Sequence, residues 1–407
     1  MTTFQPRTDS TQVTSKFGLS RIRLGSSAAL HSSTLTIALL YAVTFLLLGI
    51  GLIMVLSSSS ITSYLGNSGF LGGFWRQATY ALIGVPLMLV VARFPISFWK
   101  RWAWWLLGIG LALQLLVFTP LGVEVYGNRN WIQIGGFGGQ PSEVLKLALI
   151  VWIGTILLKK EPLLGQIKHE LIPVILPGAA LALGLVLLGR DLGTAMVMGL
   201  AVLGAMFFGG LSWKAIGLTA GTALFGVLLL VVTSENRMRR LFSFSDGNAD
   251  YSGSGWQSTH GVWALAGGGA FGSGLGNSKA KWSWLPAADN DYIFAIIGEE
   301  LGLVGALLVI VLYVVLAIVM LRVIGRARDR FGRTVAGGIL VWIVGQAFIN
   351  IGVVIRVFPV LGVPLPLISA GGTALIACLL AMGVVISIAR DGEQYQADLQ
   401  REEERTR

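Results

Sequence analysis

The carboxylate of Asp291 is the side chain in this sequence best placed to do chemistry. It follows a polar loop rich in glycine and tryptophan and precedes an apolar run long enough to predict a membrane-spanning helix. A carboxylate at such a boundary can act as a general base that accepts a proton from a hydroxyl group. The alternative is a helix N-cap, a position that aspartate favours. Asp289 competes for either role.

Glu299 and Glu300 lie one to two turns further into the same predicted helix. Ionisable side chains inside a span are costly and normally face the interior of the bundle with a partner. One interpretation is a hydrogen bond between helices that fixes their packing. The other is an effect on the pKa of Asp291.

A second set of polar residues lies in two other predicted spans. Glu143 and Lys146 are spaced i, i+3, so they share a helix face and can form an ion pair. This pair is either a structural lock or part of the lining of a polar cavity. Gln346 and Asn350 are spaced i, i+4 on another span, where amides most often connect helices.

Cationic residues gather in segments expected on the same side of the membrane as Asp291. Arginine suits a diphosphate ligand because its planar guanidinium makes paired hydrogen bonds. A contact with lipid headgroups is the alternative for any one of them. The candidates for contact with an anionic substrate are Arg129 and the nearby Trp131, Lys146, Arg190, Arg239, Arg240, Lys279 and Lys281.

The elements that must position these residues are membrane-spanning helices. The chain has 407 residues, of which 54% are hydrophobic and only 12% are charged, about half the charged share of a soluble protein. We expect an all-α polytopic membrane protein with one ten-span domain, 35–389, between cytoplasmic tails 1–34 and 390–407. The predicted spans are 35–57, 75–92, 102–119, 141–158, 171–189, 192–210, 215–233, 292–321, 334–355 and 367–389.

Lysine and arginine collect in alternate connections, which predicts that both termini are cytoplasmic. This distribution argues against nucleic acid as the partner of a chain with net charge +10. The long connection 234–290 then lies on the outer face, and connections of this length are usually functional or disordered. The PLPLISAGGTAL run from Pro364 predicts a re-entrant start to the last span, because the freed backbone groups need protein or water partners.

Several classes of site are not expected. Cys378 is the only cysteine and the three histidines are far apart, which argues against disulfides, cysteine metal clusters and zinc sites. The glycine-rich run 267–276 lacks the strand–turn–helix context of a dinucleotide site, so we expect it to supply tight turns and close packing. No organic cofactor is predicted. The first apolar run is a full-length span, so a cleaved signal peptide is not expected.

Together these segments resemble the SEDS family (shape, elongation, division and sporulation), in particular its cell-division members. The matching runs follow the family order and, with the hydropathy, cover about residues 40–390. They are NRNWIQIGGFGGQPSEVLKLAL from Asn128, GRDLGTA from Gly189, RMRRLFSF from Arg237, GLGNSKAKWSWLPAADNDYIFAIIGEELG from Gly274 and NIGVVIRVFPVLGVPLPLISAGGTAL from Asn350.

The resemblance implies a peptidoglycan glycosyltransferase that polymerises lipid II at the outer face of the bacterial cytoplasmic membrane. It implies a class B penicillin-binding protein as partner, with other membrane proteins of the division machinery. The family's essential aspartate falls on Asp291, its arginine–tryptophan motif on Arg129 and Trp131, and its glutamate–lysine pair on Glu143 and Lys146. Such an enzyme would transfer the sugar with inversion and release polyprenyl diphosphate, and a magnesium or manganese ion is a further expectation.

Two positions depart from the family pattern: Ala370 replaces a common tyrosine, and Arg356 stands where small or apolar residues are usual. Two other functions remain open, a lipid II flippase with a polar path through the bundle and a non-catalytic division scaffold. Small residues allow close helix approach, so we expect the partner's membrane helix to dock on spans eight and nine. The candidate docking residues are Gly302, Gly305, Gly337 and Gly338.

Overall fold

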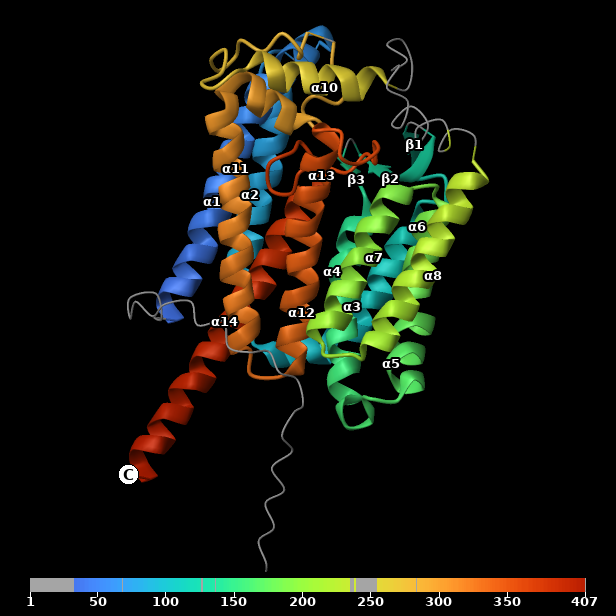
Figure 1. The fold of residues 1–407 in the computed structure, drawn as a ribbon, viewed down its shortest axis with the longest axis vertical. Helices are drawn as coiled ribbons and strands as arrows, with labels where there is room; N and C mark the ends of the chain where they lie inside the picture. The colour runs from blue at the N-terminus through green and yellow to red at the C-terminus, as the bar shows by residue number, and fades with distance from the viewer. Residues whose placement is uncertain are drawn as a thin grey trace, which may run out of the picture.

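Long helices run side by side in a bundle in the computed structural model, which describes residues 33–67, 69–125, 127–135, 137–234, 238, 255–282 and 284–406 (Figure 1). Within these residues, eight helical segments are long and apolar enough to cross a membrane. They are α1 (Ser33–Leu65), α2 (Gly72–Val91), α4 (Pro141–Lys159), the run α5–η3–α6 (Ile167–Leu188), α8 (Trp213–Val232), α11 (Ile293–Arg326), the run α12–η4–α13 (Arg330–Val354) and α14 (Thr373–Thr406). The first run consists of α5 (Ile167–Val174), η3 (Ile175–Ala179) and α6 (Ala180–Leu188), and the second of α12 (Arg330–Leu340), η4 (Val341–Gly345) and α13 (Gln346–Val354).

Two further helices complete the bundle, α3 (Ile96–Leu116) and the shorter apolar α7 (Leu192–Phe208). Each predicted span overlaps one of these helices or helical runs. The helix α4 lies in the centre and is buried on nearly every face, packed against α3, α7 and α12. Apart from Glu143 and Lys146 near its start, its sequence is mostly apolar on every face, which is typical of a helix surrounded by other helices or lipid. The helix α8 is equally apolar but buries only Ala215, so most of its surface faces outward.

A small antiparallel sheet between α3 and α4 corrects the all-α expectation. Its strands, in the order β1 (Gly122–Val125), β2 (Asn128–Ile134) and β3 (Phe137–Gly139), pair Val123 with Trp131 and Glu124 with Arg129. Two turns join the strands, and each contains a glycine at positive φ, Gly127 and Gly135. Two of the strands, β1 and β3, are shorter than most in globular proteins, and hydropathy alone did not reveal the sheet.

The helix α11 is broken near its outer end by Gly302, whose φ is 68°. The glycine-rich loop fills the break: Leu303 N donates to Gly269 O at 2.9 Å, and Ser273 N donates to Glu299 O at 2.9 Å. A Cβ on Gly272 would lie 2.1 Å from the main-chain oxygen of Glu300, so only glycine fits there. The expected role of this run in tight turns and close packing is therefore confirmed.

The last predicted span begins at Thr373 rather than at 367, because the residues between α13 (Gln346–Val354) and α14 form an irregular segment. We call residues 355–372 the PLPLIS segment. Its Leu367 has a φ of 68°, which a helix cannot contain. The freed backbone groups find partners inside the protein: Ser369 Oγ accepts from Leu365 N at 2.8 Å, and Tyr313 Oη donates to Pro366 O. The irregular entry to this helix is confirmed.

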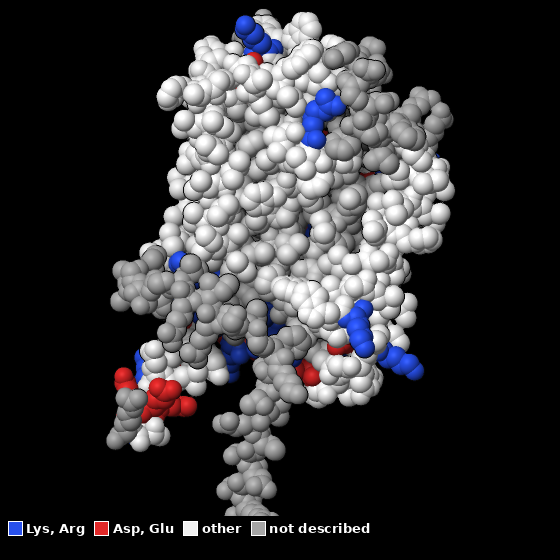
Figure 2. Space-filling view, in the orientation of Figure 1, with Lys and Arg blue, Asp and Glu red and all other residues white. Residues whose placement is uncertain are grey.

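Charged residues gather at the two ends of the bundle, and the middle of the face shown in Figure 2 is almost free of them. Ion pairs join the first turns of α3 and the α4–α5 connection to the α11–α12 turn at one end. These pairs are Lys100–Asp329 at 2.5 Å and Arg330–Glu161 at 3.1 Å. The connections that carry the predicted cytoplasmic cations therefore share one end.

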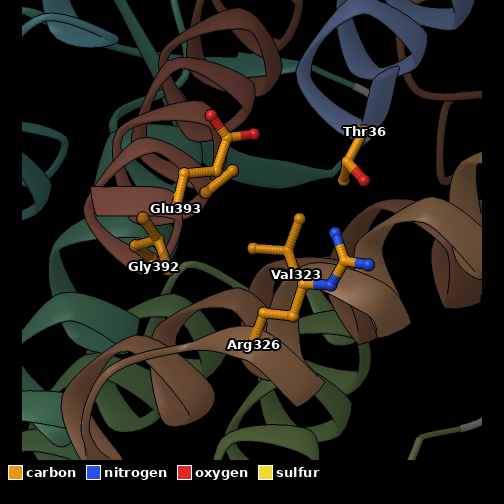
Figure 3. Close-up of a pocket in the computed structure, with 7 residues that line it drawn as sticks. Thr36, Val323, Arg326, Gly392 and Glu393 are labelled. Carbon is orange, nitrogen blue, oxygen red and sulfur yellow. The ribbon is translucent and has the colours of Figure 1, made fainter. Parts of the chain in front are cut away.

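The C-terminal residues continue α14 as a single helix to Thr406, which extends beyond the bundle at the same end (Figure 1). Near the point where it leaves, a small cavity of about 10 Å³ is lined by side chains that include Thr36, Arg326 and Glu393 (Figure 3). Arg326 is the last residue of α11, whereas Asp291 precedes its first residue. This cavity is therefore at the opposite end of the protein from the candidate catalytic residue.

Candidate functional site

Asp291 lies between the start of α11 and the PLPLIS segment. The N-cap of α11 is Tyr292, and no side chain caps this end, so the structure does not support the N-cap alternative for Asp291. Its main-chain oxygen accepts a hydrogen bond from Asn350 Nδ2 at 2.7 Å. A Cβ placed on Gly362 would lie 3.6 Å from Asp291 Oδ2, which puts the PLPLIS segment directly beside the carboxylate.

The two residues before Asp291 are held in the same way. Ser369 Oγ donates to Asn290 O at 2.6 Å, and Ala370 N donates to Asp289 O at 2.9 Å. Three successive main-chain oxygens thus accept hydrogen bonds from α13 and the PLPLIS segment. Burial raises the pKa of the Asp289 carboxyl, although the nearby Arg76 opposes this change. Asp289 remains the alternative base.

Glu299 and Glu300 anchor the loop that leads to Asp291. Glu299 accepts from Ser278 Oγ and, at 2.8 Å, from Lys279 N. Glu300 accepts from Ser57 Oγ on α1 at 2.6 Å and forms an ion pair with Lys281 at 3.4 Å. Both glutamates are buried, so they fit the predicted packing role better than an effect on the pKa of Asp291.

The two lysines of this loop have different surroundings. Lys281 is buried, and its ammonium group also donates to Gly276 O at 2.5 Å. This placement does not fit the predicted contact with substrate and makes Lys281 part of the loop anchor. Lys279 is exposed, and only its main-chain N–H contacts Glu299 in the described part of the chain. Lys279 therefore stays a candidate for substrate contact.

A short helix, α10 (Trp256–Gly267), holds the other side of this loop (Figure 1). Trp256 Nε1 donates to Trp284 O at 2.8 Å, and Gln257 Nε2 donates to Pro286 O at 3.0 Å. The ring of His260 stacks on Trp256 with a centroid separation of 3.8 Å. Neither Gln257 nor His260 was identified from the sequence as part of this support.

The predicted ion pair in α4 is present and buried. Lys146 Nζ lies 2.9 Å from Glu143 Oε1, with side-chain exposures of 2% and 3%. The ammonium group also donates to Gln346 Oε1 at 3.4 Å and lies 4.8 Å from the centre of the Trp342 ring. Gln346 Nε2 in turn donates to Pro364 O at 2.8 Å. The burial of both side chains favours the structural lock. Gln346 connects the ion pair to the PLPLIS segment.

The predicted arginine–tryptophan motif lies on β2. Arg129 donates from Nε to Val117 O at 3.1 Å and from Nη2 to Thr119 O at 3.1 Å, so its guanidinium ties the sheet to the end of α3. Its main-chain N–H contacts Gly189 O at 2.8 Å, which brings the exposed Arg190 close to the sheet. Trp131 on the same strand is half-buried.

The sheet and the Asp291 region border a common element. Gln140 N, just after β3, donates to Thr373 Oγ1 at 2.9 Å where the PLPLIS segment ends. A Cβ on Gly193 at the start of α7 would lie 2.2 Å from Leu361 O. The PLPLIS segment therefore contacts β3, α7 and the Asp291 region. Arg239 and Arg240 lie outside the described residues.

An apolar cavity of about 420 Å³ lies between helices that contact one another only loosely. Residues of α5, η3 (Ile175–Ala179), α6, α7 and α8 line it, and nearly all of them are aliphatic, Gly or Thr. Such a space can hold a hydrocarbon chain. The sequence did not predict it, because it depends on how α8 diverges from its neighbours.

The predicted docking surface on glycines is wrong. A Cβ on Gly337 would lie 2.3 Å from Phe208 Cβ, and one on Gly338 would lie 2.8 Å from Ile150 Cγ2. Both glycines therefore pack against other helices of the same chain. Gly302 and Gly305 are buried as well. The pattern of small residues therefore reflects close helix contacts inside the bundle.

The fold and site together define a class: a polytopic helical membrane protein with a carboxylate held where a bundle helix meets an ordered glycine-rich loop. The model of the FtsW, RodA and SpoVE family, described as cell cycle protein, matches residues 38–394, and the chain belongs to this family.

Relatives with known names agree with this assignment. The chain is 38% identical to the probable peptidoglycan glycosyltransferase FtsW of Mycobacterium tuberculosis, over 94% of this chain and 73% of the relative. It is 36% identical to the stage V sporulation protein E of Bacillus subtilis, over 86% of this chain and 96% of the relative.

Two solved structures share the fold. One comes from work titled structural coordination of polymerization and crosslinking by a peptidoglycan synthase complex, with a TM-score of 0.69 and 24% identity over 87% of this chain and 97% of that one. The other is the rod shape determining protein RodA of Thermus thermophilus, with a TM-score of 0.64 and 24% identity over 86% and 96%.

Proposed function

We propose that this protein is a peptidoglycan glycosyltransferase that polymerises lipid II into glycan strands during septal wall synthesis. The observation that carries the proposal is the anchoring of Asp289, Asn290 and Asp291 by three hydrogen bonds to their main-chain oxygens. A base must be held within a fraction of an ångström of its working position to be effective, and this arrangement supplies such support. The names of relatives in the same family support the reaction class.

In the proposed reaction the Asp291 carboxylate accepts the proton of the acceptor's 4-hydroxyl group. The hydroxyl oxygen bonds to the donor's anomeric carbon, and the bond from that carbon to the lipid diphosphate breaks. The configuration inverts, because one displacement occurs. Negative charge grows on the leaving diphosphate, so cations near the site lower the barrier. Lys279 and Arg190 are exposed and suited to this role, whereas Lys146 and Lys281 are buried in structural pairs.

A divalent cation, magnesium or manganese, belongs to this proposal. No group of three His, Cys, Asp or Glu side chains in the described residues could hold a metal ion alone. Magnesium is usually held by one or two carboxylates together with substrate phosphates and water. Asp291 can supply a carboxylate, and the buried Oδ1 atoms of Asn290 and Asn350 have no hydrogen-bond partner among the described residues. These groups fit a cation that would neutralise charge on the diphosphate.

The apolar cavity beside α8 is the proposed site for a polyprenyl chain of a lipid substrate. Its lining is almost entirely hydrocarbon, and it lies between helices that face the lipid. The sugar and diphosphate would then extend toward the outer end of the bundle.

We further propose that α3 and α7 also cross the membrane, for ten spans with both tails in the cytoplasm. The lysine- and arginine-rich connections lie at the same end of the bundle, which supports this orientation. A single-pass class B penicillin-binding protein is the proposed partner, with other division proteins. Its helix would bind the outward face of α11, where Leu307, Leu308 and Val311 are exposed, on the helix that begins beside Asp291.

The test uses the purified protein with and without a transpeptidase partner, supplied with lipid II and magnesium. Glycan chains formed by the wild type and lost in Asp291→Asn support the proposal. Movement of lipid II between liposome leaflets without polymer would instead indicate a flippase. Activity in neither assay, with retained binding to division proteins, would indicate a scaffold.

A further inference from the structure

Arg356 adopts a backbone conformation that arginine rarely tolerates. Its φ of 59° lies in the left-handed region, which favours glycine because a side chain there crowds the backbone. Strained residues are retained where the surrounding structure enforces them, and they concentrate at functional sites. The strained backbone at Arg356 therefore points to a functional role for its side chain.

The strain is enforced by contacts on both sides of Arg356. Arg356 N donates to Val353 O at 3.1 Å, and Val357 N donates to Gly352 O at 2.7 Å. The ring of Phe358 packs against Gly352, where an added Cβ would lie 2.6 Å from Phe358 Cδ2. The chain turns sharply after α13, and Arg356 is part of this turn.

This turn is next to the proposed catalytic base. Asn350, one turn before the end of α13, binds the main-chain oxygen of Asp291, and Gly362 at the far end of the turn lies beside its carboxylate. Both ends of the turn that carries Arg356 therefore contact the Asp291 region.

The Arg356 side chain is half-buried, and no hydrogen bond or ion pair joins its guanidinium to a described residue. An arginine without an ion-pair partner among the described residues, on a turn whose two ends contact the region of the proposed base, is suited to bind an anionic substrate.

We propose that Arg356 binds phosphate oxygens of the polyprenyl diphosphate in the lipid substrate. The inference rests on the proposed function for its substrate. From the sequence, Arg356 was identified only as a departure from the family pattern. The proposal adds it to the cations that contact the substrate. The guanidinium can contact two phosphate groups at once, so it favours a diphosphate over a monophosphate.

The experiment measures binding of polyprenyl diphosphate and polyprenyl monophosphate to the full chain in phosphatidylcholine nanodiscs. We expect Arg356→Gly to weaken diphosphate binding by about tenfold or more, the loss of one charge-assisted contact, and monophosphate binding by less. Arg356→Asn, which also tolerates positive φ, should do the same, and Arg356→Lys should retain part of the affinity. The melting temperature of Arg356→Gly should stay equal or rise, because glycine relieves the strain.

Asn67→Gly is the matched control. Asn67 also has positive φ, 59°, in the exposed α1–α2 connection, so the change eases the backbone there without altering diphosphate binding. Wild-type diphosphate affinity in Arg356→Gly would overturn the proposal, as would equal losses for both lipids together with a lower melting temperature. Competition by phosphatidylglycerol that matches polyprenyl diphosphate would assign Arg356 to headgroups instead. Because binding is measured without turnover, absence of polymerisation would reject the proposed function alone.

Discussion

The side-chain amide of Asn350 donates to the main-chain oxygen of Asp291 at 2.7 Å and to that of Val363 at 2.8 Å. One amide group on α13 thus joins the start of α11 to the PLPLIS segment. Ser369 and Ala370 repeat the connection at the two preceding residues. The backbone position of Asp291 is therefore set by contacts with α13 and the PLPLIS segment.

Removing the amide of Asn350 should slow catalysis more than it lowers substrate affinity. Asn350→Leu keeps the branched shape of the side chain but leaves two carbonyl groups without a donor, at a cost of about 1–3 kcal/mol each. We expect kcat for lipid II polymerisation to fall by about tenfold or more, with KM changed less. Steady-state rates with labelled lipid II check this expectation. An unchanged kcat would show that Ser369 and Ala370 alone hold the residue.

Replacing Asp291 with asparagine should abolish polymerisation and leave the fold intact. Asparagine keeps the size of the side chain but cannot accept a proton as a carboxylate does. Activity is measured by gel analysis of glycan chains, and folding by melting temperature and partner binding. Asp289→Asn is the control and should keep measurable activity. Near wild-type activity in Asp291→Asn, with loss in Asp289→Asn, would transfer the role to Asp289.

Removing one member of the buried Glu143–Lys146 pair should destabilise the protein more than removing both. A single substitution leaves a buried charge without its partner, which costs about 3–5 kcal/mol in soluble proteins. Melting temperatures of Glu143→Gln, Lys146→Met and the double variant test this expectation. Additive losses would argue against a structural pair. A stable but inactive Lys146→Met would instead indicate contact with substrate.

Breaking the Glu300–Lys281 ion pair should loosen the loop before Asp291. Glu300→Gln loses the charge that holds Lys281 and weakens the contact with Ser57, so hydrogen exchange over residues 273–282 should become faster. Polymerisation should fall, and a bound partner should restore part of it by reordering the loop. Exchange is followed by mass spectrometry, with α4 as the internal control. Unchanged exchange in the loop would show that α10 and its tryptophans hold it without this pair.

The raised pKa of Asp289 predicts a pH dependence of stability. Its folded-state pKa is above the unfolded value because burial disfavours the charged form. The folded state therefore binds more protons between the two pKa values, and stability falls as the pH rises through that window. Melting temperatures between about pH 4 and 7 should fall less in Asp289→Asn than in the wild type. Parallel curves for the two proteins would contradict the assignment.

The sequence by itself determined the helical membrane class, the approximate spans and the family, because each depends on local information. Apolar length marks a helix that can cross a bilayer, and alternating charge marks its sides. It also identified the Glu143–Lys146 pair, since residues three apart on a helix must be neighbours.

Only the tertiary structure decided which polar residues act on one another across the bundle. The contacts of Asn350 with Asp291 and of Glu300 with Ser57 join residues far apart in sequence, so no local pattern in the sequence predicts them. The strained backbone of Arg356 and the burial of Lys281 likewise follow from how the segments pack. The same reason explains the wrong docking surface: a small residue predicts a close contact, but only the fold determines whether the neighbour is another protein or the same chain.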